Sequence, residues 1–148
     1  MEPFEMVNSE KKYLCDHMCA DLGKWLRIAG YDAIIIDSGL SDEEVLNLAV
    51  KERRCILTKD SDFKKKKEAV LLKGKSLEAW VKQLKEEEGI NWLYRPFSRC
   101  LKCNVPLETV ALDRWVCPSC HQEFWLGSHT EHMAAQLRAW SENHFYID

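Results

Sequence analysis

The sequence has none of the features that direct a chain into a membrane or out of the cell. No apolar run approaches the roughly 20 residues that a membrane-spanning helix needs. Residues 1–5 are acidic and lack the pattern of a signal peptide. Only the lysines at residues 64–67 form a low-complexity segment, and no internal repeat is present. We therefore expect a cytoplasmic protein with no membrane association.

A strong charge of either sign and the common catalytic motifs are also absent. The formal net charge is −3, so any contact with nucleic acid must come from local basic clusters. There is no glycine-rich phosphate loop and no recognisable Ser–His–Asp or Cys–His arrangement. The chemistry of this chain must therefore lie in its acids and its cysteines.

Four of the seven cysteines stand in two C-x-x-C pairs, a pattern typical of metal sites. Cys100 and Cys103 form the first pair, Cys117 and Cys120 form the second, and thirteen residues separate the two pairs. Each pair offers two thiolates from one tight turn, and together they complete the tetrahedron that Zn²⁺ prefers. Two disulfides are the alternative, but nothing in the sequence indicates an oxidising compartment. We expect a structural zinc ribbon with no open coordination position.

The part of the chain before these pairs alternates apolar runs with amphipathic segments. Strands are predicted at the apolar runs 13–15, 33–36, 55–58 and 69–72. A first helix is predicted from about Met18, which begins an apolar helical pattern, to Gly30 at its end. A second helix begins at a capping box at residues 41–44. Two more helices are predicted over residues 76–88 and 130–140. Cys15, Cys19 and Cys55 fall in these segments and are interpreted as small buried hydrophobes.

Strands that alternate with helices indicate an α/β fold, in which a parallel sheet has helices on both faces. Right-handed crossovers place the carboxyl ends of all strands at one edge, where ligands collect. The composition changes near residues 95–97. We therefore predict an α/β domain at residues 10–95, and a zinc ribbon with a C-terminal helix at residues 96–148.

Five carboxylates are predicted to meet at that edge of the sheet. Asp16 follows the first strand, Asp60 and Asp62 follow the third, and Asp42 and Glu43 begin the helix between the second and third strands. Mg²⁺ and Mn²⁺ favour oxygen ligands, and a carboxylate cluster suits metal-assisted phosphodiester hydrolysis. Each acid also has a structural explanation, because acids are favoured in the first turn of a helix and in ordinary turns.

Several short motifs also resemble a known family. They are residues 14–16 (LCD), 22–27 (LGKWLR), 30–32 (GYD), 41–44 (SDEE), 57–60 (LTKD), 97–103 (FSRCLKC), 117–120 (CPSC) and 124–129 (FWLGSH). In this order, over roughly residues 13–135, they resemble the PIN-like ribonuclease family named after the C-terminal domain of the Mut-seven exonuclease. Its members carry a zinc ribbon after a PIN-like core.

The resemblance implies a PIN-like fold, RNA as substrate and a metal-dependent ribonuclease site. Asp16, Asp42 and Asp60 would hold Mg²⁺ or Mn²⁺, with Asp62 or Glu43 assisting. Related PIN-like domains often read Asp-Glu-Asn after the first strand, whereas this chain has Asp-His-Met at residues 16–18. That difference removes one acid and favours single-metal or weak binding.

Basic residues near the predicted site are candidates for contacts with RNA. Lys24 and Arg27 are expected to share a helix face and to position phosphate, and Lys59 and His129 are further candidates. A solvated helix face or an exposed histidine is the alternative. The lysines at 64–67 have the same two interpretations, as a track for the RNA backbone or as solvated surface.

Two other functions remain open at this stage. The chain can be a non-catalytic RNA- or protein-binding adaptor with a degenerate core, or the toxin of a toxin–antitoxin pair, although the added ribbon argues against the latter. For the ribonuclease we expect single-stranded RNA and a protein or ribonucleoprotein partner at the ribbon, whose aromatic residues can stack on bases. The RNA target and the oligomeric state are not fixed by the sequence.

Overall fold

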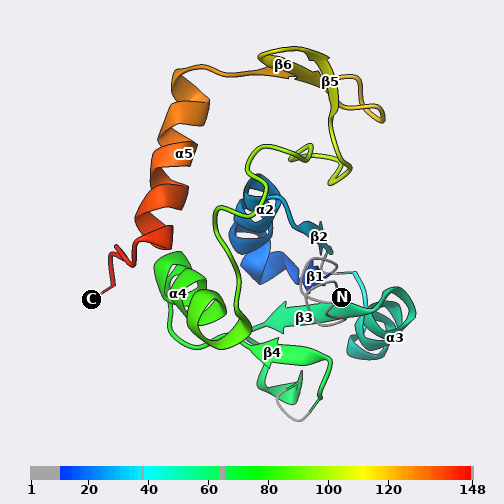
Figure 1. Ribbon diagram of the computed structural model, residues 1–148. Coiled ribbons are helices and arrows are strands. Elements are labelled where there is room, and N and C mark those ends of the chain that lie inside the picture. The colour runs from blue at the N-terminus through cyan, green and yellow to red at the C-terminus, as the bar shows by residue number, and fades with distance from the viewer. Residues whose placement is uncertain (1–10, 38, 64–65, 148) are drawn as a thin grey trace, which may run out of the picture.

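The computed structural model describes residues 11–37, 39–63 and 66–147. At its centre is a parallel sheet of four strands (Figure 1). The strands lie in the order β2-β1-β3-β4, and each neighbouring pair is parallel. Their bounds are Lys12–Cys15 (β1), Asp32–Ile35 (β2), Arg54–Thr58 (β3) and Ala69–Leu71 (β4). The predicted α/β fold with a parallel sheet is confirmed.

Three helices flank the sheet, and their bounds are Ala20–Ala29 (α2), Asp42–Glu52 (α3) and Leu77–Glu88 (α4). They cover both faces, because successive side chains of a strand point to opposite sides. Tyr13 and Cys15 of β1 belong to a core that includes residues of α2 and α4. Leu14, between them, belongs to a second core with α3. One short strand therefore supports two separate cores.

The ends of the helices follow the capping residues that the sequence indicates. The Ser41 hydroxyl accepts a hydrogen bond from the Glu44 amide, and the Glu44 carboxylate accepts one from the Ser41 amide, so the predicted capping box opens α3. Gly30 ends α2 at φ 105°. A β-carbon at Gly30 would collide with the carbonyl oxygen of Arg95, so both the backbone angle and the space require glycine.

One side chain of the first helical segment differs from its prediction. Met18, which the helical pattern placed with the apolar positions, is 64% exposed. Residues His17–Cys19 form a 3₁₀ turn, and the α-helix begins only at Ala20. Because a 3₁₀ turn has three residues per turn rather than 3.6, the apolar face of α2 does not extend back to Met18.

The cysteine-rich part of the chain forms a small antiparallel sheet followed by a helix. The strands β5, β6 and β7 pair in that order. The bounds of these elements are Glu108–Ala111 (β5), Arg114–Val116 (β6), Glu123–Trp125 (β7) and Ser128–Ser141 (α5). The predicted ribbon-like sheet and C-terminal helix are both present. Helix α5 runs back from the ribbon to α4 (Figure 1).

Helix α5 is fixed to the sheet domain at its C-terminal end. Trp140 is 1% exposed, and its ring centroid lies 4.8 Å from that of Trp25 and 5.3 Å from that of Trp92. Its indole Nε1 donates a hydrogen bond of 2.6 Å to Glu78. The ammonium of Lys85 donates to the carbonyl oxygens of Trp140 and Ser141, where the helix dipole favours a positive charge.

The division of the chain into units at 10–95 and 96–148 stays a prediction. Two features noted in the sequence lie wholly or partly outside the described residues, namely the acidic residues 1–5 and the lysine run at 64–67, of which residues 64 and 65 are not described. Within the described ranges, no helix is both long and apolar enough to cross a membrane.

Candidate active site

A cleft of about 570 Å³ opens where the strands β1 and β3 end and α3 begins. Asp16 and Asp60 reach it from the ends of the two strands, and Asp42 reaches it from the first turn of α3. The structure thus brings these three sequence-predicted acids to one edge of the sheet, as the parallel strand order requires. Asp37, which follows β2, also lines the cleft.

Three of the carboxylates form a compact cluster at this edge. One oxygen from each of Asp42, Asp60 and Asp62 lies within 4.8 Å of the other two. Around one Mg²⁺ ion, with oxygen ligands at about 2.1 Å, neighbouring ligand atoms lie roughly 3 to 4 Å apart. Small side-chain movements would therefore suffice for these acids to share a cation. All are oxygen donors at the surface, which suits a hard ion that retains water.

Asp16 stands beside this cluster and is joined to it by a buried threonine. Thr58, which is 1% exposed, donates a hydrogen bond of 2.7 Å to Asp16 Oδ2 and accepts one of 3.0 Å from the Asp60 amide. The other oxygen of Asp16 accepts from the Met18 amide at 3.0 Å. Asp60 Oδ1 accepts from the Asp62 amide at 2.9 Å. One hydroxyl therefore sets the relative positions of the two strand ends.

The sequence prediction missed Thr58 and Asp37. Thr58 looks like any β-branched strand residue, and no local pattern reveals its bond to Asp16. Asp37 could have been found, because it follows an apolar strand in the same way as Asp16 does.

Two predicted site residues lie elsewhere. Glu43 is exposed on the first turn of α3 and does not line the cleft. His129 is exposed in the first turn of α5, which starts at the ribbon, away from α3 and β3 (Figure 1). The structure does not bring His129 to the carboxylates.

The basic residues near the cleft have different environments. Lys59 lines the cleft, and its ammonium lies 5.6 Å from the centroid of the Trp80 ring. Lys24 is exposed on α2, whereas Arg27 is 8% exposed. Of the two residues expected to contact phosphate, only Lys24 is therefore exposed.

Arg27 joins the sheet domain to the cysteine-rich segment. Its Nε donates a hydrogen bond of 2.7 Å to the Ala33 carbonyl, and its Nη1 donates one of 2.6 Å to the Leu101 carbonyl. Burial lowers the pKa of this guanidinium, but an arginine remains charged at neutral pH. With its side chain buried and both Nε and Nη1 bonded inside the protein, Arg27 has a structural role, and we do not propose it as a contact to substrate.

The four cysteines of the two C-x-x-C pairs converge in space. Their sulfur atoms all lie within 4.8 Å of one another, and Cys100 Sγ is 3.8 Å from Cys120 Sγ. Tetrahedral zinc with Zn–S bonds of about 2.3 Å requires sulfur atoms about 3.8 Å apart. A disulfide requires about 2.05 Å. Amide groups of Cys103 and Cys120 donate to the sulfurs of Cys100 and Cys117, at 3.4 and 3.3 Å. The donor set fits zinc.

The remaining cysteines are structural. Cys15 and Cys19 are fully buried and Cys55 is half-buried. Burial raises the pKa of Cys19 to about 12 and that of Cys55 to about 12. Thiols with such pKa values are poor nucleophiles at neutral pH, which agrees with the sequence interpretation.

Comparison with known protein families gives one match. The Mut7-C RNAse domain matches residues 11–137, a range that includes the carboxylate cleft, the cysteine cluster and most of α5. No curated protein and no solved structure shows a significant match to the chain.

Proposed function

Because the chain belongs to the Mut7-C RNAse domain family, we propose that it is a metal-dependent ribonuclease that hydrolyses RNA phosphodiester bonds in the carboxylate cleft. The observation that carries this proposal is the cluster of Asp42, Asp60 and Asp62, whose oxygens lie within 4.8 Å of one another at the edge of the sheet. An edge formed by the carboxyl ends of parallel strands is where such folds bind ligands.

In this proposal Asp42 and Asp60 hold Mg²⁺ or Mn²⁺, and Asp62 assists. When bound, the ion polarises the scissile phosphate and lowers the pKa of a bound water. Asp16 is held by Thr58 and the Met18 amide, so its carboxylate is oriented before substrate arrives. Preorganised groups contribute to catalysis because they need no rearrangement during the reaction.

Two lysines are assigned to the substrate. Lys59 lines the cleft directly after β3 and supplies a positive charge beside the carboxylates. Lys24, exposed on α2, is the second proposed contact. Lysine ammonium groups bind phosphate as point charges and suit a substrate whose sequence is not read.

We also assign structural zinc to the four cysteines, because all four tetrahedral positions would be filled by thiolates. The ribbon would then guide RNA rather than cut it. Trp125 is 60% exposed on β7, and His129 lies close by in the sequence. Exposed aromatic side chains stack on unpaired bases, which supports single-stranded RNA as the substrate.

A second function is favoured by the surface of the ribbon. Four apolar side chains there are more than half exposed, namely Val110, Leu112, Trp125 and Leu126. An adaptor that binds RNA or protein without cleavage would use such a surface. The adaptor needs no metal at the carboxylates, so metal-dependent turnover separates the two functions.

The deciding experiment is cleavage of a labelled single-stranded RNA pool by zinc-loaded protein with Mn²⁺, with Mg²⁺ or with neither. We expect cleavage only with a divalent ion, and a loss of at least about 100-fold in the Asp42→Asn/Asp60→Asn variant. Asp21→Asn, an exposed acid on α2 outside the cleft, is the matched control and should cleave normally. RNA binding without turnover in the wild type would favour the adaptor. Equal cleavage by both variants would contradict the proposed site.

A further inference from the structure

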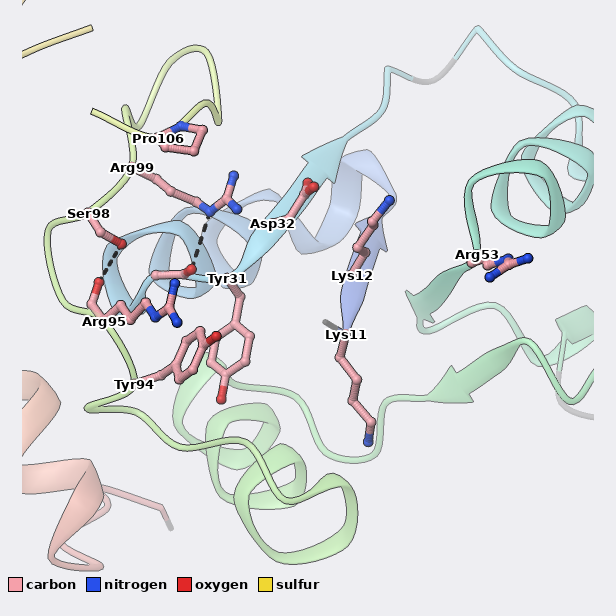
Figure 2. Close-up of a pocket in the computed structure, with 11 residues that line it drawn as sticks. Lys11, Lys12, Tyr31, Asp32, Arg53, Tyr94, Arg95, Ser98, Arg99 and Pro106 are labelled. Carbon is pink, nitrogen blue, oxygen red and sulfur yellow. Dashed lines mark hydrogen bonds between the residues drawn. The ribbon is translucent and has the colours of Figure 1, made fainter. Parts of the chain in front are cut away.

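A second cleft, of about 490 Å³, lies at the opposite edge of the sheet (Figure 2). Its lining residues include Lys12 at the start of β1, Asp32 at the start of β2 and Arg53 just before β3. The other wall is formed by the chain that follows α4, at residues 94–99, and by Pro106. This cleft shares no lining residue with the carboxylate cleft.

The lining of this second cleft, called here the basic cleft, has an unbalanced charge. It contains one acid, Asp32, and five cations, which are Lys11, Lys12, Arg53, Arg95 and Arg99. Asp32 already accepts hydrogen bonds from Arg54 at 2.8 Å and from Asn104 at 2.7 Å. Within the described part of the chain, none of the five cations forms an ion pair. The lining therefore keeps an excess of positive charge.

Some of these cations are held in place by neutral groups. Arg99 donates to the carbonyl oxygens of Gly30 and Asn104, at 3.2 and 2.6 Å. Lys11 donates to the carbonyl oxygen of Glu88 at 3.3 Å. These bonds orient the side chains without cancelling their charge. In Figure 2, Lys11 and Lys12 stand on one side of Asp32, and Arg99 stands on the other.

The aromatic residues of the basic cleft do not offer a platform for a base. The rings of Tyr31 and Tyr94 stack at 4.7 Å between centroids. The guanidinium of Arg95 lies 5.0 Å from the Tyr94 centroid. Tyr31 is 6% exposed, and its hydroxyl accepts a hydrogen bond from the Asn91 amide. The pair supports Arg95 rather than a ligand, so the cleft presents charge and not a stacking surface.

From this arrangement we propose that the basic cleft binds the phosphodiester backbone of single-stranded RNA, as a site separate from the carboxylate cleft. Cations on both walls suit a chain of phosphates better than a single phosphate group. The absence of a free ring face predicts that binding does not depend on base identity. RNA is the polyanion chosen because the chain belongs to an RNAse domain family.

The position of the basic cleft allows one RNA strand to reach both edges of the sheet. β1 has four residues, which at about 3.3 Å each separates its two ends by roughly 13 Å. A strand of a few nucleotides covers this distance along the surface. Binding at the basic cleft would hold the RNA while another part of it enters the carboxylate cleft.

The test is the affinity of a fluorescein-labelled oligouridine, measured by fluorescence anisotropy over a range of salt concentrations. Buffers contain no Mg²⁺ or Mn²⁺, so the result does not depend on whether the protein cleaves RNA. The variant is Lys12→Gln/Arg95→Gln, which removes one cation from each wall. Each phosphate contact contributes about 0.7 to the slope of log affinity against log salt. We expect the slope to fall by about 1.4, and the affinity at about 0.1 M salt to fall about 25-fold.

The control is Lys82→Gln/Arg138→Gln, which removes two exposed cations outside the basic cleft and should change the affinity less than about twofold. Thermal unfolding of both variants verifies that they are folded. An equal loss in both, or no loss in the cleft variant, would overturn the proposal. Displacement of the RNA by polyglutamate at equal charge concentration would also overturn it, since the site would then be one for acidic polypeptides.

Discussion

The two metal-competent clusters of this protein are built in opposite ways. In the cysteine cluster, Cys100 and Cys117 are fully buried, and four thiolates leave no position for a substrate. In the carboxylate cluster, three acids stand at the surface at the mouth of a cleft. A closed thiolate site can only support structure, whereas an open carboxylate site leaves positions for water and phosphate. The two clusters should therefore respond differently to substitution.

The difference extends to how each cluster is attached to the sheet domain. The turn that carries Cys100 and Cys103 is bonded to that domain by Arg27 and by Asn104, whose Oδ1 accepts from the Ala33 amide at 3.1 Å. In the carboxylate cluster, the acids are attached through their own strand ends and α3. Loss of the cysteine cluster should thus affect the whole protein, and loss of the acids only the cleft.

The largest effect is expected for Cys100→Ser. Structural zinc sites contribute on the order of 10 kcal/mol to folding, and the Cys100 turn is bonded to the sheet domain. We expect loss of zinc, and a fall in the melting temperature of the entire chain rather than of the ribbon alone. Zinc content by mass spectrometry and thermal unfolding by circular dichroism check this. A zinc-free variant that melts like the wild type would remove the distinction between the two clusters.

The second-largest effect is expected for Arg27, which joins the sheet domain to the cysteine-rich segment. Arg27→Met keeps the apolar stem but leaves the carbonyl oxygens of Ala33 and Leu101 without their donor. Each buried, unsatisfied group costs about 1–3 kcal/mol, so for two such groups we expect a loss of about 2–6 kcal/mol in the free energy of unfolding, measured with urea. Lys24→Met, an exposed position on the same helix, should cost less than about 0.5 kcal/mol. If both variants lost the same amount, Arg27 would not be the joint.

The sequence predicted those features that depend on neighbouring residues. The four strands, the capping box at Ser41, the glycine end of α2 and the cysteine spacing are all short-range patterns, and each is found in the structure. The acids were predicted to meet because parallel strands bring their carboxyl ends to one edge. Local chemistry and a topological rule were sufficient for these features.

The features that the sequence did not predict depend on contacts between distant segments. Arg27 is spaced like an exposed residue, but its side chain is buried and donates to the carbonyl of Leu101, 74 residues away. Thr58 is bonded to Asp16, 42 residues earlier. The basic cleft collects cations from separate segments, with no motif among them. Such partners can be identified only from the folded structure.

A moderate effect is expected for Thr58, whose hydroxyl links the ends of β1 and β3. Thr58→Val has nearly the same shape but loses the donor to Asp16 and the acceptor for the Asp60 amide. Loss of a hydrogen bond to a charged group costs about 1.5–3 kcal/mol, and a displaced Asp16 should lower the cleavage rate about tenfold. Thr58→Ser should restore both values. A Thr58→Val protein that cleaves normally would show that the acids need no such support.

The smallest effect is expected for Asp32, a carboxylate with a structural role. Burial alone would raise the pKa of Asp32, but hydrogen bonds from Arg54 and Asn104 lower it below the ordinary value of 3.8. A lowered pKa means that the unfolded chain binds the proton more readily, so this stabilisation is present above about pH 4 and is lost as the pH falls further. The difference in unfolding free energy between the wild type and Asp32→Asn should therefore narrow below about pH 4.

Urea unfolding at several pH values checks this prediction, and taking the difference between the two proteins removes the loss of zinc in acid, which affects both alike. A difference that stays constant down to pH values of about 3 would mean that Asp32 is not held as an ion. Asp32 Oδ1 already accepts hydrogen bonds from Arg54 and Asn104, and these bonds compete with any metal for that oxygen. Among the described residues, no arginine forms an ion pair with the acids of the cleft. The arginine ion pair of Asp32 therefore distinguishes this structural carboxylate from the acids of the cleft.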